Sequence, residues 1–108
     1  MVNKVALVTG GARRLGKDIS IALSGIGYDI ILNYNKTPKD VLQETISKIN
    51  EKGVKVTPVK YDVSNVNEIK KMFQFIKTEY KTLDLLVNNA AIYSKFFGRK
   101  KISNEEIC

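Results

Sequence analysis

A glycine-bearing turn near the N-terminus carries the clearest chemical signal in this sequence. Residues 9–16 read TGGARRLG and directly follow the apolar run Val5 to Val8. A turn between a strand and a helix can hold a pyrophosphate, because backbone amides and the helix N-terminus face the anion. Gly10 would permit the tight turn, and Gly16 would let the helix approach the strand and a ligand closely. Turns between a strand and a helix also use glycine for their geometry alone, without any ligand.

Residue types that carry acid–base or metal chemistry are scarce. The 108 residues include no histidine and one cysteine, Cys108, which removes His-based dyads, cysteine-rich metal sites and an internal disulfide. No apolar run is long enough to span a bilayer, and the start of the chain does not resemble a secretory signal. We therefore expect a reducing, cytoplasmic setting.

The net charge of +7 raises the question of a nucleic-acid partner. Most lysines alternate with acids along the expected helices, and the one basic cluster, residues 98–101, lacks interleaved aromatic residues. Solvated helix faces explain this pattern better, so we expect no nucleic-acid partner.

The elements that must position the glycine turn follow from hydrophobic patterning. Apolar runs of strand length alternate with stretches of helical period, which favours a parallel sheet with helical crossovers. The expected strands are Val5–Val8, Ile30–Leu32, Val54–Val59 and Leu83–Val87. Right-handed crossovers and a nucleotide-binding first turn predict the strand order 3-2-1-4. This is the N-terminal half of an α/β, Rossmann-type doubly wound parallel sheet, within a single domain.

Helical periodicity predicts which side chains are buried. Leu15, Ile19, Ala22 and Ile26 lie at spacings of four, three and four, so we expect them on one buried face of the first helix, which Gly27 ends. The apolar positions of the second and third helices are Leu42, Ile46 and Ile49, and then Ile69, Met72, Phe73, Ile76 and Tyr80.

The second helix also has start and stop signals. Thr37 is expected as its N-cap, Pro38 as its first helical residue and Gly53 as a left-handed C-terminal cap.

The fourth strand is expected to be an uncovered edge. A continuously apolar strand is buried on both faces, so Leu85 to Val87 would require a further strand and helix beside them. Ser103 and Glu106 have the spacing of a capping box that opens a helix, and the sequence ends within its first turns. We therefore expect residues 1–108 to be a partial domain, truncated in the helix after the fourth strand.

Three motifs in this order, TGGARRLG, then YDVS, then VNNAA after the fourth strand, resemble those of the short-chain dehydrogenase/reductases over the whole chain. The resemblance implies a domain that binds NAD(H) or NADP(H). It implies that Thr9, Gly10 and Gly16 line the phosphate site, with the adjoining Arg13, Arg14 and Leu15 at the cofactor. It further implies that Asp62 and Val63 meet the adenine, that Asn88 braces the sheet, and that Asn89, Ala90 and Ala91 contact the ribose side.

Arg14 departs from the family pattern, which has a glycine at its position. The change resembles pteridine-reductase-like members, in which the arginine reaches the pyrophosphate and the substrate pocket; the alternative is a solvated side chain at a helix start. In the same members an aromatic residue at the position of Tyr93 stacks over substrate and nicotinamide, although a loop tyrosine also packs on a surface without further role.

The end of the second strand bears on the choice of cofactor. Enzymes that select NAD place an acid there, which bonds the ribose 2′-hydroxyl and repels a 2′-phosphate. This stretch reads Asn33, Tyr34, Asn35, Lys36, without a carboxylate, and Arg13 and Lys36 are available to pair a phosphate. NADPH is therefore favoured over NADH, unless the two cations are ordinary surface residues.

The catalytic residues of the family are missing from this sequence. The resemblance implies a Ser, Tyr, Lys mechanism, in which the tyrosine of a Tyr-x-x-x-Lys pair protonates the carbonyl oxygen and the lysine lowers the pKa of that tyrosine. None of the five tyrosines in this sequence has a lysine four residues later. We expect the parent enzyme to be an NADPH-dependent, homo-oligomeric short-chain reductase of a carbonyl, oxoacyl or pteridine-like substrate, and this chain alone to be inactive. The alternative is a non-catalytic mini-domain for nucleotide binding or protein interaction.

Overall fold

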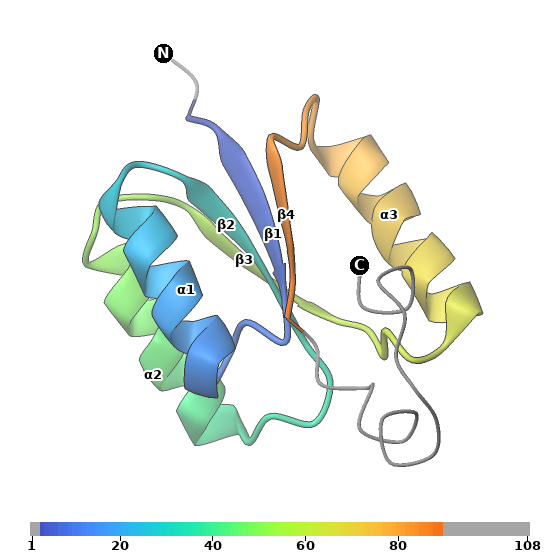
Figure 1. The fold of residues 1–108 in the computed structure, drawn as a ribbon, viewed down its shortest axis with the longest axis horizontal. Coiled ribbons are helices and arrows are strands. Elements are labelled where there is room, and N and C mark those ends of the chain that lie inside the picture. The colour runs from blue at the N-terminus through green and yellow to red at the C-terminus, as the bar shows by residue number, and fades with distance from the viewer. Residues whose placement is uncertain (1–2, 90–108) are drawn as a thin grey trace, which may run out of the picture.

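Four parallel strands and three helices make up the described part of the chain (Figure 1). The computed structural model describes residues 3–89. Its elements are β1 (Val5–Thr9), α1 (Arg14–Gly25), β2 (Asp29–Tyr34), α2 (Lys39–Asn50), β3 (Val56–Lys60), α3 (Val66–Glu79) and β4 (Leu85–Asn88). The strand order β3-β2-β1-β4 confirms the predicted topology and fold class.

The alternation of side chains along the strands divides the interior into two cores. Ala6, Val8, Ile30 and Leu32 point to the face covered by α1 and α2. The alternate residues of the same strands, Val5, Leu7 and Ile31, point to the opposite face, where Met72 and Ile76 of α3 cover them. Because β1 and β2 are covered on both faces, they are apolar at nearly every position.

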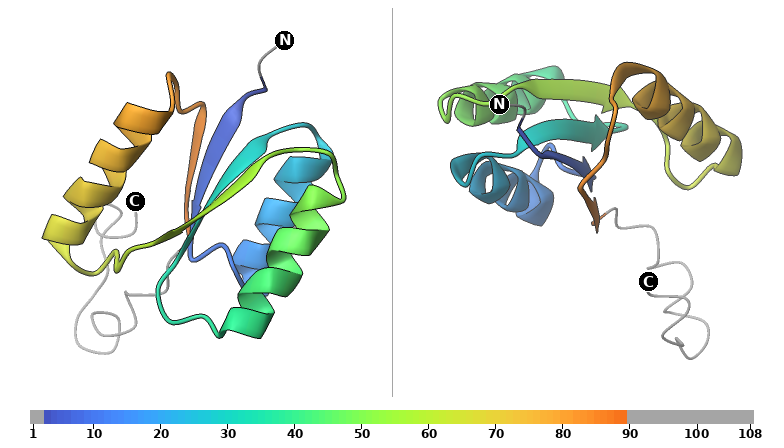
Figure 2. Two further views of the ribbon diagram at one scale, coloured as in Figure 1. Left: turned by 180° about the vertical axis from the view of Figure 1, so that it is seen from behind. Right: turned by 90° about the horizontal axis from the view of Figure 1, so that it is seen from above.

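Parallel pairing brings the carboxyl ends of the strands to one edge of the sheet. Thr9 pairs with Asn88, and Tyr34 pairs with Lys60, so all four strands end near the same level. Figure 2 shows the opposite side and the view from above, with α1 and α2 together on one side of the twisted sheet and α3 on the other. Residues just beyond the strands are thereby gathered into one region, where open α/β sheets bind ligands.

The predicted buried face of α1 is wrong for Leu15, Ala22 and Ile26, whereas the half-buried Ile19 does pack against the core. Leu15 is 63% exposed, and Ala22 and Ile26 are exposed as well. The residues that are buried are small: Gly16, Ser20 and Ser24. Large side chains there would hold the helix away from the sheet, so close packing selects small residues, which a search for apolar periodicity overlooks.

The ends of α2 and α3 are set by local capping. Pro38, not Thr37, is the N-cap of α2 and makes no side-chain cap bond, so the prediction at that end was displaced by one residue. Gly53 has the expected positive φ, +83°. At the start of α3, the Asn65 side chain accepts hydrogen bonds from the amides of Asn67 and Glu68. None of the helices within residues 3–89 is long and apolar enough to cross a membrane.

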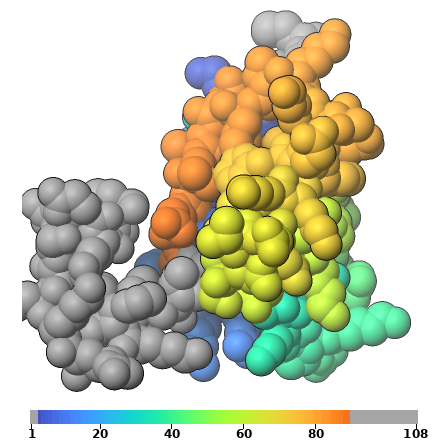
Figure 3. Space-filling view, turned by 90° about the vertical axis from the view of Figure 1, so that its right-hand side faces the viewer, coloured from blue at the N-terminus to red at the C-terminus, as the bar shows by residue number. Residues whose placement is uncertain are grey.

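Both edge strands of the described sheet are less buried than the centre. β3 contains Pro58, which lacks an amide donor and is tolerated at an edge. On β4, Leu86 is 50% exposed, as expected for an uncovered edge. Figure 3 looks onto this side of the molecule, with the atoms of β4 beside those of α3.

Two alanine substitutions test the exposed position of Leu15 on α1 and the core beneath α2. Ile49→Ala removes a fully buried side chain and should lower the free energy of unfolding by about 2–5 kcal/mol. Leu15→Ala should change it by no more than about 0.5 kcal/mol, because that side chain is mostly in water. Urea unfolding measures both values. Equal losses in the two variants would contradict the corrected assignment.

Candidate functional site

A cleft of about 440 Å³ lies at the carboxyl ends of the strands. It is formed by the turn after β1 and by the segments that follow β2, β3 and β4. Its lining residues are Gly10, Arg13, Arg14, Leu15, Asn33, Tyr34, Asn35, Lys36, Thr37, Tyr61, Asp62, Val63 and Asn89.

Most of the predicted site residues meet in this cleft. Ten lining residues were predicted from the sequence, nine as cofactor-binding residues and Lys36 as a cation for a phosphate; Thr9 and Gly16 lie behind them, and Ala90 and Ala91, like Tyr93, lie outside the described residues. Thr37 and Tyr61 line the cleft but were not predicted as site residues. Position is the signal that could have identified them, since Tyr61 directly follows β3 and Thr37 lies three residues after the end of β2. The binding roles of all these residues remain predictions.

The glycine turn is held by a buried asparagine. Gly10 has φ +61°, a left-handed conformation that glycine adopts at little cost. Its amide donates to Asn33 Oδ1 at 3.2 Å, and the Gly11 amide donates to the Asn33 carbonyl at 2.9 Å. Both amides are therefore engaged within the protein. The amides that remain for an anion are those at the start of α1, which have no acceptor within the helix.

Gly16 is required by the close approach of α1 to the turn. A Cβ at this position would collide with the Gly10 carbonyl oxygen and lie 2.5 Å from Asn89 Nδ2. The role predicted for Gly16 in helix packing thus has a physical basis, because any side chain would push the first turn of α1 away from β1 and β4.

Thr9 and Asn89 fasten β1 to β4 beside the cleft. The Asn89 amide donates to Thr9 Oγ1 at 2.8 Å, and Asn89 Nδ2 donates to the Gly10 carbonyl at 3.3 Å. Thr9 Oγ1 also lies 3.3 Å from Asn88 Oδ1, in keeping with a bracing role for Asn88. The Thr9 side chain is buried against β4, so it supports the glycine turn from behind the cleft.

Arg14 adopts a conformation that is unusual for its residue type. It begins α1 with φ +56°, the only positive φ of a non-glycine residue among those described. The left-handed region costs an L-residue about 1–2 kcal/mol. Arg14 therefore occupies a position suited to glycine, and its exposed side chain lines the cleft next to that of Arg13.

The rim of the cleft is rich in cations. Arg13, Arg14 and Lys36 are exposed at the rim, and Asp62 is the only acid among the described lining residues. Asp62 Oδ1 accepts hydrogen bonds from the Ser64 amide at 2.9 Å and its hydroxyl at 2.6 Å, which orients that carboxylate toward its own loop. The field in the cleft is consequently suited to an anion.

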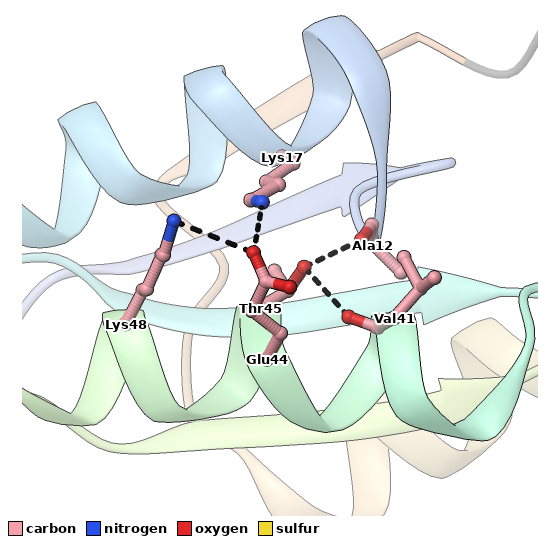
Figure 4. A network of polar contacts seen from close by, with 6 residues as sticks. All are labelled: Ala12, Lys17, Val41, Glu44, Thr45 and Lys48. Atoms are coloured by element: carbon pink, nitrogen blue, oxygen red, sulfur yellow. Dashed lines mark hydrogen bonds and ion pairs between the residues drawn. The ribbon is translucent and has the colours of Figure 1, made fainter.

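An ion-paired group joins α1 to α2 on the outer side of the turn (Figure 4). Glu44 Oε1 lies 2.8 Å from Lys17 Nζ and 3.4 Å from Lys48 Nζ. The hydrogen bond from Lys17 is the main cause that lowers the pKa of the Glu44 carboxyl, and the same bond raises the pKa of Lys17. Since these groups are open to solvent, they fasten the two helices only weakly.

The described residues can bind but offer little catalytic chemistry. They contain no group of three or more His, Cys, Asp or Glu side chains that could hold a metal ion. The described residues that line the cleft include no Tyr-x-x-x-Lys pair. The cleft combines the amides at a helix start with three cations and two tyrosines, Tyr34 and Tyr61, an arrangement suited to an anionic ligand.

Comparison with known proteins agrees with this geometry. A family model described as short chain dehydrogenase matches residues 4–108. The 3-oxoacyl-[acyl-carrier-protein] reductase FabG of Staphylococcus epidermidis is 35% identical over 91 residues, which are 84% of this chain and 37% of that protein.

A second relative differs in length. The short-chain dehydrogenase/reductase homolog YusS of Bacillus subtilis is 36% identical over 92 residues, which cover 85% of this chain and 84% of YusS. YusS is thus itself about as short as this chain, whereas the chain spans only about a third of the length of FabG.

Solved structures show the same fold. A candidate dehydrogenase from Burkholderia cenocepacia with bound NADP superposes with a TM-score of 0.73 at 26% identity, covering 81% of this chain and 34% of that one. Four parallel strands and their helices are therefore shared with proteins about three times as long.

Replacing Arg14 with glycine tests the strained conformation. We expect Arg14→Gly to raise the free energy of unfolding by about 1 kcal/mol, because glycine adopts φ +56° without the cost borne by arginine. Arg13→Gly is the matched control: φ there is −153°, so glycine relieves no strain and only increases the freedom of the unfolded chain. Urea unfolding distinguishes the two, and equal destabilisation by both would refute the strain.

Proposed function

This chain belongs to the short-chain dehydrogenase family, and from that premise we propose that it is the NADPH-binding part of a reductase acting on a carbonyl or pteridine-like substrate. The observation that carries the proposal is the convergence of Arg13, Arg14 and Lys36 on a cleft that also contains the start of α1. The family is one of oxidoreductases; the cofactor preference and the substrate class are our inference.

The chemistry of the cleft suits a dinucleotide phosphate. Its volume of about 440 Å³ lies in the range of small-molecule sites, roughly 300–1,000 Å³. Amides in the first turn of α1 would face the pyrophosphate, where the helix dipole favours negative charge. Asp62 and Val63, on the β3 side, would border the adenine. When bound, the cofactor would supply the hydride.

The preference for NADPH rests on charge. Tyr34, Asn35 and Lys36 follow the buried part of β2 along the cleft and include no acid to bond a 2′-hydroxyl. Arg13 lines the same cleft from the turn before α1. Together with Lys36 it would pair the 2′-phosphate of NADPH, and neither cation would gain a partner from NADH. The Burkholderia cenocepacia relative with bound NADP supports this choice.

The substrate is proposed from two sources. FabG is named for reduction of a 3-oxoacyl group, and the arginine at position 14 resembles pteridine-reductase-like members. Either substrate presents an unsaturated bond that accepts hydride. Arg14 would then contact the pyrophosphate on one side and the substrate on the other. We further propose a cytoplasmic, homo-oligomeric parent enzyme that does not bind nucleic acid.

A second candidate function has support of its own. YusS, of nearly the same length as this chain, indicates that a short form of the family occurs elsewhere. A protein of this kind would bind a nucleotide and act as a binding or interaction module without hydride transfer. The two candidates share the cleft and differ in whether the chain acts as part of a protein that also supplies the acid–base residues of hydride transfer.

Cofactor titration tests the charge argument. The 108-residue chain should bind NADPH more tightly than NADH, and Lys36→Gln should weaken NADPH binding about tenfold while leaving NADH binding unchanged, because only NADPH offers the 2′-phosphate. Lys70→Gln, an exposed lysine of α3 away from the cleft, is the matched control and should alter neither. Calorimetry or fluorescence of the reduced nicotinamide gives the dissociation constants. Tighter binding of NADH would overturn the preference.

Turnover distinguishes the reductase part from a complete enzyme. Without a Tyr-x-x-x-Lys pair, the purified chain should not oxidise NADPH above background with an acetoacetyl thioester or a dihydropteridine as substrate. Absorbance at the reduced nicotinamide band reports the rate. Sustained oxidation that is lost in Gly16→Leu, which blocks the packing of α1, would show that this chain is catalytically complete and our expectation wrong.

A further inference from the structure

Four consecutive carbonyl groups in the turn between β1 and α1, those of residues 10–13, each accept a hydrogen bond from a different residue. The bonds are Asn89 Nδ2 to Gly10 at 3.3 Å, Ser20 Oγ to Gly11 at 3.3 Å, Thr45 Oγ1 to Ala12 at 2.6 Å and the Lys17 amide to Arg13 at 3.3 Å. The Ser20 hydroxyl lies closer, at 2.8 Å, to the Gly16 carbonyl, so its bond to Gly11 is the weaker of its two. The shortest of the four bonds to the turn comes from α2, an element that contributes no residue to the lining of the cleft.

Thr45 is built for this contact. Its side chain is completely buried in the face of α2 that packs toward α1 and the sheet (Figure 4). The hydroxyl also lies 3.2 Å from the Val41 carbonyl, one turn earlier in the same helix. A hydroxyl has one proton to donate, and helical threonines often give it to that earlier carbonyl. The much shorter distance to Ala12 shows that here the bond to the turn is preferred.

The orientation of the Ala12 carbonyl has consequences for the next two residues. A trans peptide is planar, so fixing the Ala12 carbonyl toward α2 directs the Arg13 amide away from α2. It also fixes the backbone that leads into Arg14, whose φ of +56° persists only where its surroundings hold it. The bond that follows, from the Lys17 amide to the Arg13 carbonyl, is long, so it holds the backbone less firmly.

We propose that Thr45 is a positioning residue for phosphate binding. Through the Ala12 carbonyl, it sets the direction of the amides and of the two arginine side chains at the start of α1. It touches neither the cleft nor the ligand. This role rests on the proposed nucleotide-binding function, and it identifies α2 as the element that orients the phosphate-facing backbone.

The experiment uses four variants of the 108-residue chain, three at Thr45 and one control, and two ligands. Thr45→Val keeps the shape but removes the hydroxyl, Thr45→Ser restores a hydroxyl, and Thr45→Ala is a second variant without one in case valine prevents folding. Glu44→Gln, in the adjacent residue, breaks the surface ion pairs between α1 and α2 and is the matched control for helix contact in general. The ligands are ADP, which contains the pyrophosphate, and adenosine, which does not.

We expect Thr45→Val to weaken ADP binding by roughly fivefold, about what one hydrogen bond contributes, and adenosine binding by less than twofold. Thr45→Ser and Glu44→Gln should remain within twofold of the unaltered chain for both ligands. Amide chemical shifts in ¹⁵N spectra give the affinities, and those of Arg13 and Arg14 should move in Thr45→Val and return in Thr45→Ser.

The possible failures are distinguishable. If the unaltered chain binds neither NADPH nor ADP, the nucleotide function fails and the role of Thr45 fails with it. A second outcome is that the unaltered chain binds ADP while Thr45→Val and Thr45→Ala bind ADP as tightly as it does, or lose affinity for ADP and for adenosine to the same extent. In either case only the positioning role is overturned. Absence of rescue by Thr45→Ser would overturn it as well.

Discussion

The side chain of Asn33 joins the ends of three strands, and the cleft depends on it. It is 2% exposed, its oxygen accepts from the Gly10 amide, and its nitrogen donates to the Tyr61 carbonyl at 3.1 Å. An aspartate of the same shape has no proton to donate at neutral pH, so its carboxylate would face the Tyr61 carbonyl without a bond. The fold therefore requires an amide at residue 33 whichever nucleotide is bound. The preference proposed for NADPH therefore depends on residues 34–36, whose side chains do not join the strand ends in this way.

Close packing of α1 is the second constraint, and it explains which residues surround the turn. Gly16, Ser20 and Ser24 bring the helix against the sheet, and Ser20 also donates to the carbonyls of Gly16 and Gly11. Small polar residues thus do two tasks at once, because they leave room for the backbone and satisfy its buried carbonyls. A larger apolar face would bury more area but would move the start of α1, and with it the anion-facing amides, away from the strand ends.

Strand order and the location of the cleft could be predicted because they depend on features visible along the chain. Apolar runs separated by helical stretches identify β1 to β4, and residues after strand ends identify the cleft. The buried side of α1 could be predicted only in part: Ile19 packs against the core as expected, but the fully buried positions are glycine and serine, while Leu15 and Ile26 face solvent. The contact of Thr45 with Ala12 joins residues 33 positions apart, and only the packing of α2 reveals it.

The described contacts that shape the cleft link residues 9–89, and within the described part of the chain β4 is an edge strand of the sheet. Asn33, Thr45, Ser20 and Asn89 together hold the turn, and each belongs to the described part of the chain. Both cores are covered by α1, α2 and α3, and on β4, where Leu86 is exposed, the flanking Leu85 and Val87 pack against the core beneath α1 and α2. The two candidate functions therefore make different demands on this architecture: nucleotide binding would need the turn and the side chains that hold it, whereas hydride transfer would also need acid–base groups. The turn and its tethers are the feature that both candidate functions have in common.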